Sequence, residues 1–279
     1  MAGSTMKDIK LRIRSVESTK QITNAMQLVA SSKIRRARQR MEQTRPYMRI
    51  SRQVIADIAS HNLDETPAFF REQEGKARCV VVIAGDRGLA GHYNNAVFKL
   101  ADAQIDETTW VLPVGKKAVD RYAHRPCRLL SDRYVRTEQV KAEQCQEMAR
   151  LLIERFLSGE CGKVTMFSTT LVSALVQDAV ETTLLPVKPD PELRPSSQMI
   201  MEPGPAALLA AIMPDYLAGQ LYAAVCDAFA SEVSARRNAM DSATKNAQKM
   251  IDELSLHYNR ARQGSITQEI TEIVAGAEE

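Results

Sequence analysis

The spacing of apolar residues predicts a long helix at each end of the chain. Residues 4–66 contain no glycine and one proline, Pro46, and residues 220–263 contain neither. Because Gly and Pro disfavour a helix interior by roughly 1 and 3 kcal/mol, such stretches are typical of helices. In the second stretch apolar residues keep a four-three register, which is coiled-coil spacing. These positions are Phe229, Val233, Met240, Ala243, Ala247, Met250, Leu254, His257 and Ala261.

The N-terminal stretch has similar spacing, but its line of apolar residues moves around the helix. We expect Pro46 to kink this helix or to mark a junction. A helix over 206–277 would be roughly 100 Å long, at a rise of 1.5 Å per residue. No single small domain covers that length. We therefore expect one part of it to pair with the N-terminal helix, and another part to project or to be buried in a partner.

The middle of the chain alternates short apolar runs with helical stretches. Runs at 79–84, 109–114 and 164–168 have strand composition, and a helical pattern over 138–157 precedes the third. This order predicts a parallel, Rossmann-like α/β layer. Six prolines in 186–205 predict an extended connection to the last helix. The expected organisation is a coiled-coil helix at 1–66, an α/β domain with its connection at 67–205, and a coiled-coil helix at 206–279.

Composition narrows the class of protein further. Aromatic residues make up only 5% of the chain while methionines number 12, which favours helix packing by aliphatic and Met side chains. The five cysteines have no metal-ligand spacing, so we expect reduced structural thiols and no metal or cofactor. The N-terminus lacks an apolar signal region, and no apolar run approaches the length of a membrane span. We expect a soluble cytoplasmic protein that can dock onto a membrane complex.

A glycine-rich turn follows the first predicted strand, at 85–94. A turn of this kind between a strand and a helix can bind a nucleotide phosphate. Its spacing is G-x-x-G-x-x-G, which differs from the dinucleotide pattern, and the chain has no P-loop sequence. A structural turn is the alternative. Neither the four histidines nor any pair of carboxylates forms a recognisable catalytic arrangement, so no catalytic residue is predicted.

Basic residues are concentrated near the N-terminus. Residues 6–58 hold 13 Lys and Arg against 4 Asp and Glu, whereas the net charge of the whole chain is only +3. The densest part, 33–52, predicts an acidic partner, either nucleic acid or an acidic protein loop. A basic coiled coil that binds nucleic acid is therefore one candidate, and a Rossmann-type enzyme is another. The best heptads lie at the far end of the chain, which disfavours a basic-zipper arrangement.

Four segments resemble one known family. The run MKDIKLRIRSVESTKQITNAMQLVASSKIRRA at 6–37 is similar to the start of the gamma subunit of bacterial F-type ATP synthases. So are Asp-Arg-Gly-Leu-Ala-Gly at 86–91 with Asn94, AMDSATKNA at 239–247, and YNRARQGSITQEITEIVAGA at 258–277. The resemblance covers essentially the whole chain, with its segments in the family's order.

This resemblance implies a fold, a role and a set of partners. The terminal helices would form an antiparallel coiled coil that rotates inside a hexamer of alpha and beta subunits. The α/β domain would sit at the foot, beside the epsilon subunit and the membrane c-ring, on the cytoplasmic face of the cell membrane. Catalysis would belong to beta, and this chain would couple ion-driven rotation to ATP synthesis or hydrolysis. No nucleic-acid partner is implied.

The resemblance also assigns candidate contact residues. Arg262 and Gln263 match positions that hydrogen-bond a beta-subunit loop, and Met26 matches a position sensitive to added charge. Basic side chains would face acidic segments of beta; these are Lys33, Arg35, Arg36, Arg236 and Arg237. Ile270, Ile273 and Val274 would lie in the apolar bearing of the hexamer. Tyr47 and Glu202 are candidates for the c-ring or epsilon side.

Overall fold

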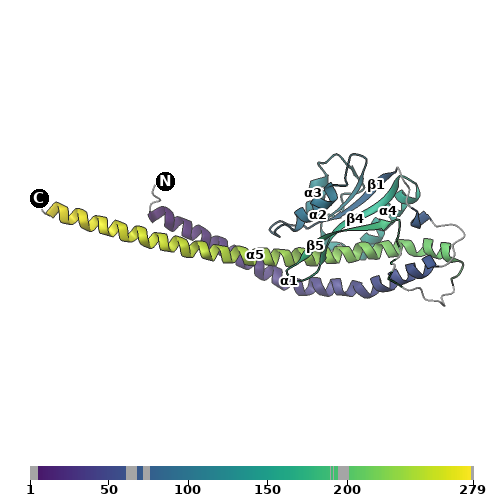
Figure 1. Ribbon diagram of the computed structural model, residues 1–279, viewed down its shortest axis with the longest axis horizontal. Helices are drawn as coiled ribbons and strands as arrows, with labels where there is room; N and C mark the ends of the chain where they lie inside the picture. Colours follow the sequence, from purple (N-terminus) through teal and green to yellow (C-terminus); the bar gives the residue numbers. More distant parts are fainter. Residues whose placement is uncertain are drawn as a thin grey trace. The chain divides into compact units, whose positions relative to one another are not determined.

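The computed structural model describes residues 6–60, 68–71, 76–188, 190, 192–193 and 201–277, with side chains described as far as 273. Figure 1 shows two long helices and a sheet with shorter helices. The elements are α1 Met6–Ser60, η1 Ala68–Phe70, β1 Ala77–Ile83, α2 Tyr93–Asp102, β2 Trp110–Val114, α3 Lys116–Tyr122, β3 Arg128–Leu129, η2 Thr137–Gln139, α4 Ala142–Leu157, β4 Cys161–Leu171, β5 Gln177–Leu185 and α5 Pro205–Ala277. The predicted α/β class with a long helix near each end is confirmed.

The chain divides into two compact units. The first consists of Met1–Ser31 with Arg236–Glu279, and we call it the helical unit. The second is Ser32–Ala235, and we call it the sheet unit. Each long helix contributes to both units, and α1 continues as a helix through Pro46.

The sheet unit contains five strands in the order β3-β2-β1-β4-β5. β1 pairs in parallel with β2 and β4, and β2 pairs in parallel with β3. The three predicted strands, β1, β2 and β4, are thus parallel as expected, whereas β5, which the sequence did not predict, runs antiparallel to β4 and makes the sheet mixed. The five consecutive residues 79–83 of β1 are all fully buried. Such a continuous apolar run is typical of a strand covered on both faces.

Two separate apolar cores cover the two faces of the sheet. One contains Val80 and Val82 of β1 together with residues of α2 and α3. The other contains Cys79, Val81 and Ile83 with residues of α4, α5 and the end of α1. Alternate residues of one strand thus serve opposite cores, as the period of two requires, and the sheet unit has three layers.

The first half of α5 is a central element of the second core. Leu209, Met213, Leu217 and Leu221 recur every four residues and are fully buried. By length and composition alone, residues 205–273 of α5 include a segment apolar enough to cross a membrane. A core helix of a soluble protein can pass the same test, and 39% of the apolar window is buried here. Residues 189, 191 and 194–200 of the Pro-rich connection predicted at 186–205 lie outside the described residues.

Candidate functional site

In the helical unit, α1 and α5 meet along an antiparallel seam made of small and polar side chains. The Thr244 hydroxyl lies 2.8 Å from the Thr23 hydroxyl, and the Gln27 amide donates to Asp241 over 3.0 Å. The Lys20 ammonium donates to the Gln248 side chain. The buried apolar residues of the seam are Ile9, Ala30, Met240 and Ala247. Small residues let two helices approach closely, but they bury little apolar area.

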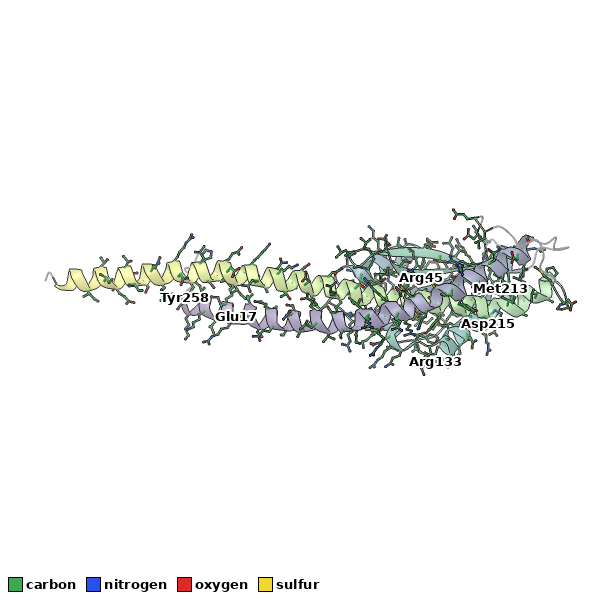
Figure 2. The ribbon with its side chains drawn as sticks, turned by 90° about the horizontal axis from the view of Figure 1, so that it is seen from below. Glu17, Arg45, Arg133, Met213, Asp215 and Tyr258 are labelled. Atoms are coloured by element: carbon green, nitrogen blue, oxygen red, sulfur yellow. The ribbon has the colours of Figure 1, made fainter. Side chains whose placement is uncertain are left out.

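The register of this seam defines where α5 continues without α1. Continuing the pairing of Gln27 with Asp241 along both helices places Met6 beside Arg262. Beyond that point no described residue of α1 lies against α5. The side chains of Ile266, Ile270 and Ile273 are 47%, 56% and 71% exposed. In Figure 2 the segment beyond Tyr258 carries its side chains on all sides of the helix.

The residues predicted to contact a beta-subunit loop lie at this transition. Arg262 and Gln263 are both exposed. No hydrogen bond or ion pair of either side chain is found within the described ranges, although the Gln263 carbonyl accepts from the Thr267 hydroxyl over 2.9 Å. Ile270 and Ile273, assigned to the bearing, are exposed about two turns and one turn before the end of α5. The side chain of Val274, assigned with them, lies outside the described residues.

The other predicted contacts are divided between the two units. In the helical unit, Met26 and Arg236 are half-buried and Arg237 is exposed. In the sheet unit, Arg35 and Arg36 are exposed on α1. The unit boundary between Ser31 and Ser32 therefore separates Met26 from the basic run.

Lys33 has a partner within the chain. Its ammonium pairs with both carboxylate oxygens of Glu138, at 2.8 and 2.9 Å. Both side chains are nearly half exposed, so the pair contributes less than about 1 kcal/mol. A contact of Lys33 with another subunit would have to compete with this ion pair, a constraint that the basic pattern alone did not reveal.

Tyr47, assigned to the foot, lies half-exposed on α1 against α5. Its hydroxyl donates to the carbonyl of Asp215 over 3.1 Å, and partial burial with the nearby Asp215 carboxylate raises the pKa of the phenol. A Cβ at Gly219 would come within 2.3 Å of the Tyr47 ring, so glycine makes this contact possible. The cavity beside them has a volume of about 470 Å³. Glu202, the other foot candidate, is exposed.

The glycine turn at the end of β1 forms its contacts inside the chain. The Gly85 amide donates to the Asn94 side chain over 2.8 Å, and the amides of Asp86 and Arg87 donate to Glu232 of α5. Glu232 is only 2% exposed. Sequence reasoning missed it because its register position looked like the rest of a core-facing helix. Residues 221–235 are mostly apolar and hold two carboxylates, Asp227 and Glu232, and that was the available signal.

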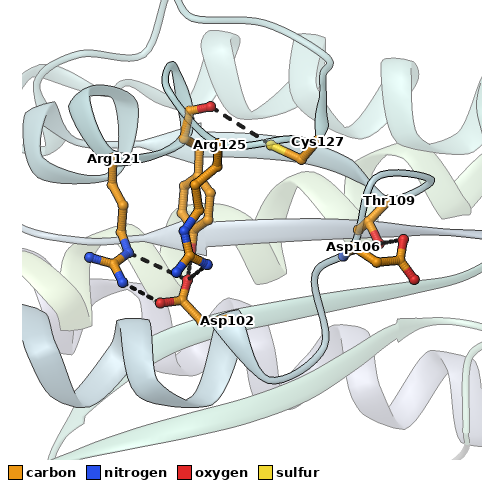
Figure 3. Close-up of polar contacts among 7 residues, drawn as sticks. Asp102, Asp106, Thr109, Arg121, Arg125 and Cys127 are labelled. Carbon is orange, nitrogen blue, oxygen red and sulfur yellow. Dashed lines mark hydrogen bonds and ion pairs between the residues drawn. The ribbon is translucent and has the colours of Figure 1, made fainter.

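A second polar cluster lies between α2 and α3 of the sheet unit. Figure 3 shows the side chains of Arg121 and Arg125 converging on Asp102. Arg125 pairs with the carboxylate at 2.6 Å, and Arg121 pairs with it as well and lies over the Phe98 ring at 4.7 Å. The Tyr122 hydroxyl donates to Asp102 over 3.0 Å, and its burial, followed by the nearby carboxylate, raises the pKa of the phenol. The cluster fixes α2 against α3.

No metal site is apparent in the described parts of the chain. No group of three His, Cys, Asp or Glu side chains there is placed to hold an ion. The five cysteines are free, and four of them are buried. Burial raises the pKa of the Cys145 thiol to about 12, so this thiol stays protonated near neutral pH.

The fold defines a class of protein in which an open α/β sheet is built on two long antiparallel helices. The family described as ATP synthase matches residues 5–279. The ATP synthase gamma chain of Ruminococcus albus is 44% identical over 277 residues, covering 97% of this chain and 96% of that protein. The chain therefore belongs to the ATP synthase gamma chain family.

Further relatives and solved structures agree with this family. The gamma chain of Acetobacterium woodii, described as sodium ion specific, is 37% identical and covers 99% of both chains. A chain of the Euglena gracilis mitochondrial ATP synthase rotor has a TM-score of 0.63 at 16% identity, covering 94% of this chain and 98% of that one. A chain from the central stalk and c-ring of Tetrahymena thermophila mitochondrial ATP synthase has a TM-score of 0.56 at 21% identity, covering 80% and 99%. These two likenesses confirm the fold.

Proposed function

We propose that this chain is the non-catalytic shaft that couples rotation of a membrane c-ring to nucleotide turnover in a hexamer of alpha and beta subunits. Family membership supports the place in the complex. The observation that carries the mechanism is the end of α5, where three isoleucines stay exposed beyond the reach of α1. Exposed apolar residues repeated along a helix indicate a partner surface, and an apolar bearing in the hexamer meets that requirement.

The mechanism is a rigid-body rotation that biases the conformations of partner sites. Because the α1 and α5 sequences differ, the coiled coil presents a different face to each of the three beta subunits. Arg262 and Gln263 would hydrogen-bond a beta loop where α5 leaves α1, and Arg35, Arg36 and Arg237 would meet acidic segments. Met26 would lie against the hexamer on the α1 side. In this proposal the chain itself binds no cofactor.

The foot of the shaft would be the sheet unit. There Tyr47 and Glu202 would face the c-ring or the epsilon subunit, which places the chain peripherally on the cytoplasmic face of the cell membrane. The exposure of Glu202 and the half-exposure of Tyr47 are compatible with such contacts. Nucleic acid has no part in this function.

A charge introduced at Met26 tests the coupling role. In membranes that contain the assembled complex, Met26→Lys is expected to reduce ATP synthesis by roughly tenfold, the effect of about 1.4 kcal/mol at a coupling step. Met26→Leu keeps the apolar volume and should retain wild-type synthesis. ATP synthesis in the Lys variant at the wild-type rate, with the complex fully assembled, would refute this role of Met26.

A further inference from the structure

The loop after β1, residues 84–92, lies where sheets of this kind bind ligands. β2 flanks β1 on one side and β4 flanks it on the other. The chain passes from β1 to β2 through α2, which packs on one face, and reaches β4 through α4, which packs on the other. The carboxyl end of β1 is therefore a topological switch point, the usual ligand position in an open α/β sheet.

A carboxylate of the same chain occupies this position. The Glu232 oxygens accept the backbone amides of Asp86 and Arg87, each at 3.3 Å. Successive backbone amides directed at one anion form the kind of concavity that elsewhere holds phosphate. A Cβ at Gly85 would come within 2.8 Å of the Glu232 carboxyl carbon, so glycine leaves the space that the carboxylate fills.

The loop is bonded in turn to η2. The Asp86 carboxylate accepts the amides of Thr137 and Glu138 at 2.8 and 3.4 Å. The Thr137 hydroxyl donates to the carbonyl of Ala84, the first residue after β1, over 2.9 Å. These bonds hold the loop against η2.

η2 is bonded to α1. Lys33 pairs with the Glu138 carboxylate, and the Arg40 guanidinium donates to the Glu138 carbonyl over 3.0 Å and to the Val140 carbonyl. One strand end of the sheet unit is therefore joined by polar bonds to both long helices, to α5 through Glu232 and to α1 through η2.

We propose that Glu232 is a positioning residue. Its carboxylate occupies the anion site at the carboxyl end of β1, and its hydrogen bonds make α5 and the sheet rotate as one body. The inference rests on the proposed function as a shaft. Apolar contact is less directional than a hydrogen bond, so bonds to Glu232 add an angular restraint to the packing of the α5 leucines. Hydrogen bonds to a buried carboxylate depend on angle and distance, and they oppose rotation of α5 about its axis.

The experiment compares Glu232→Ala with wild type in the assembled, membrane-bound complex. Two quantities are measured, the rate of ATP hydrolysis and the number of ions pumped per ATP hydrolysed. A shaft that slips against its foot keeps hydrolysis and loses at least half of the pumping ratio. A change that only impairs folding lowers both rates in proportion to the amount of complex and leaves the ratio constant. Glu181→Ala is the matched control, since Glu181 bonds to Gln104 at 2.7 Å and contacts neither long helix through that bond.

Hydrogen exchange shows whether the variant acts at the intended bonds. Loss of the charged acceptor should speed exchange of the Asp86 and Arg87 amides by roughly tenfold to a hundredfold. Acetate added to the Glu232→Ala complex should enter the vacated site and slow this exchange again. An unchanged pumping ratio in a variant whose loop amides exchange faster would overturn the proposal.

Gly85→Ala tests the same contact from the loop side. Its methyl group would displace the carboxylate, so the pumping ratio should fall as in Glu232→Ala. With Ala at both positions the methyl group no longer meets a carboxylate. The pumping ratio of the double variant should therefore be no lower than that of Glu232→Ala alone. Additive losses of the pumping ratio would contradict the proposal.

If Glu232→Ala does not assemble, Gly85→Ala alone decides, because it retains the buried carboxylate. A wild-type complex that hydrolyses ATP without pumping would refute the proposed function instead.

Discussion

The two units use the same pair of helices in opposite ways. In the sheet unit, α5 has fully buried leucines at 209, 217 and 221, and it is part of an apolar core that also contains residues of α1, η1, α4 and the strands β1, β2, β4 and β5. In the helical unit, α5 meets α1 through threonines, a glutamine and alanines, and many of its large residues stay exposed. A helix held on many sides is stabilised by its own chain. A helix that buries only a narrow strip of side chains against its neighbour depends on partner subunits to bury its other apolar residues.

Truncation of a leucine in each unit should give the largest difference. Leu217→Ala removes a fully buried side chain, so the free energy of unfolding of the sheet unit should fall by about 2–5 kcal/mol. Leu254→Ala, in the partly exposed seam of the helical unit, should cost less than about 1 kcal/mol. Trp110 lies in the sheet unit and provides the fluorescence signal for denaturant unfolding. Equal losses would contradict the contrast between the units.

Two aspartates on α5 should respond to pH in opposite directions. Burial raises the pKa of Asp227 in the sheet unit, whereas the hydrogen bond from Lys245 lowers the pKa of Asp241 in the helical unit. A raised folded pKa means that stability falls as pH rises through that pKa, and a lowered one means that stability is lost as pH falls through it.

Asparagine variants separate these two effects. At neutral pH, Asp227→Asn should stabilise the chain, and the gain should shrink toward the pKa of an unfolded aspartate, about 3.9. Asp241→Asn should slightly destabilise it at neutral pH, and the loss should vanish in acid. Thermal unfolding between about pH 2 and about pH 8 measures both, because the pKa of Asp241 lies below that of an unfolded aspartate, about 3.9. Parallel pH profiles would show that the two carboxylates experience the same environment.

The smallest effect concerns strain within the sheet unit. Leu89 has a positive φ of 61° and is 62% exposed, so its conformation costs energy that its side chain does not recover by burial. Leu89→Gly should raise the free energy of unfolding by up to about 1 kcal/mol. Gly91 has the same φ and open space around it, so Gly91→Ala should have the opposite effect. Measurement by denaturant unfolding that found Leu89→Gly destabilising would reveal a packing role for this leucine.

The sequence predicted the elements whose signal is local. The strand expected at 79–84 is β1 within two residues at either end, because a strand buried on both faces is continuously apolar. β5 was missed because Gln177–Leu185 is mostly polar and partly exposed, as an edge strand is. β3 is two residues long and gives no pattern.

The contacts between distant segments could not be predicted. Glu232 bonds to residues about 146 positions away in the chain, and Lys33 pairs with a residue 105 positions away. Neither pairing leaves a periodic pattern in the sequence. Opposite charges are also common on protein surfaces, so charge alone does not identify which residues pair. The family resemblance supplied Arg262 and Gln263 as expected contact residues. The bonds that join the sheet to the long helices could be identified only from the three-dimensional structure.

The pairing of α1 with α5 has a consequence for synthesis on the ribosome. Ile55 and Ile58 near the end of α1 share one core with Leu209 and Leu217 of α5, although some 150 residues separate them. At roughly 5–20 residues per second, α1 leaves the exit tunnel on the order of ten seconds before its partner exists. Contacts of such long sequence separation also form slowly. The nascent chain thus presents an apolar, basic helix to the solvent until α5 has been made, and this exposed helix favours aggregation before assembly.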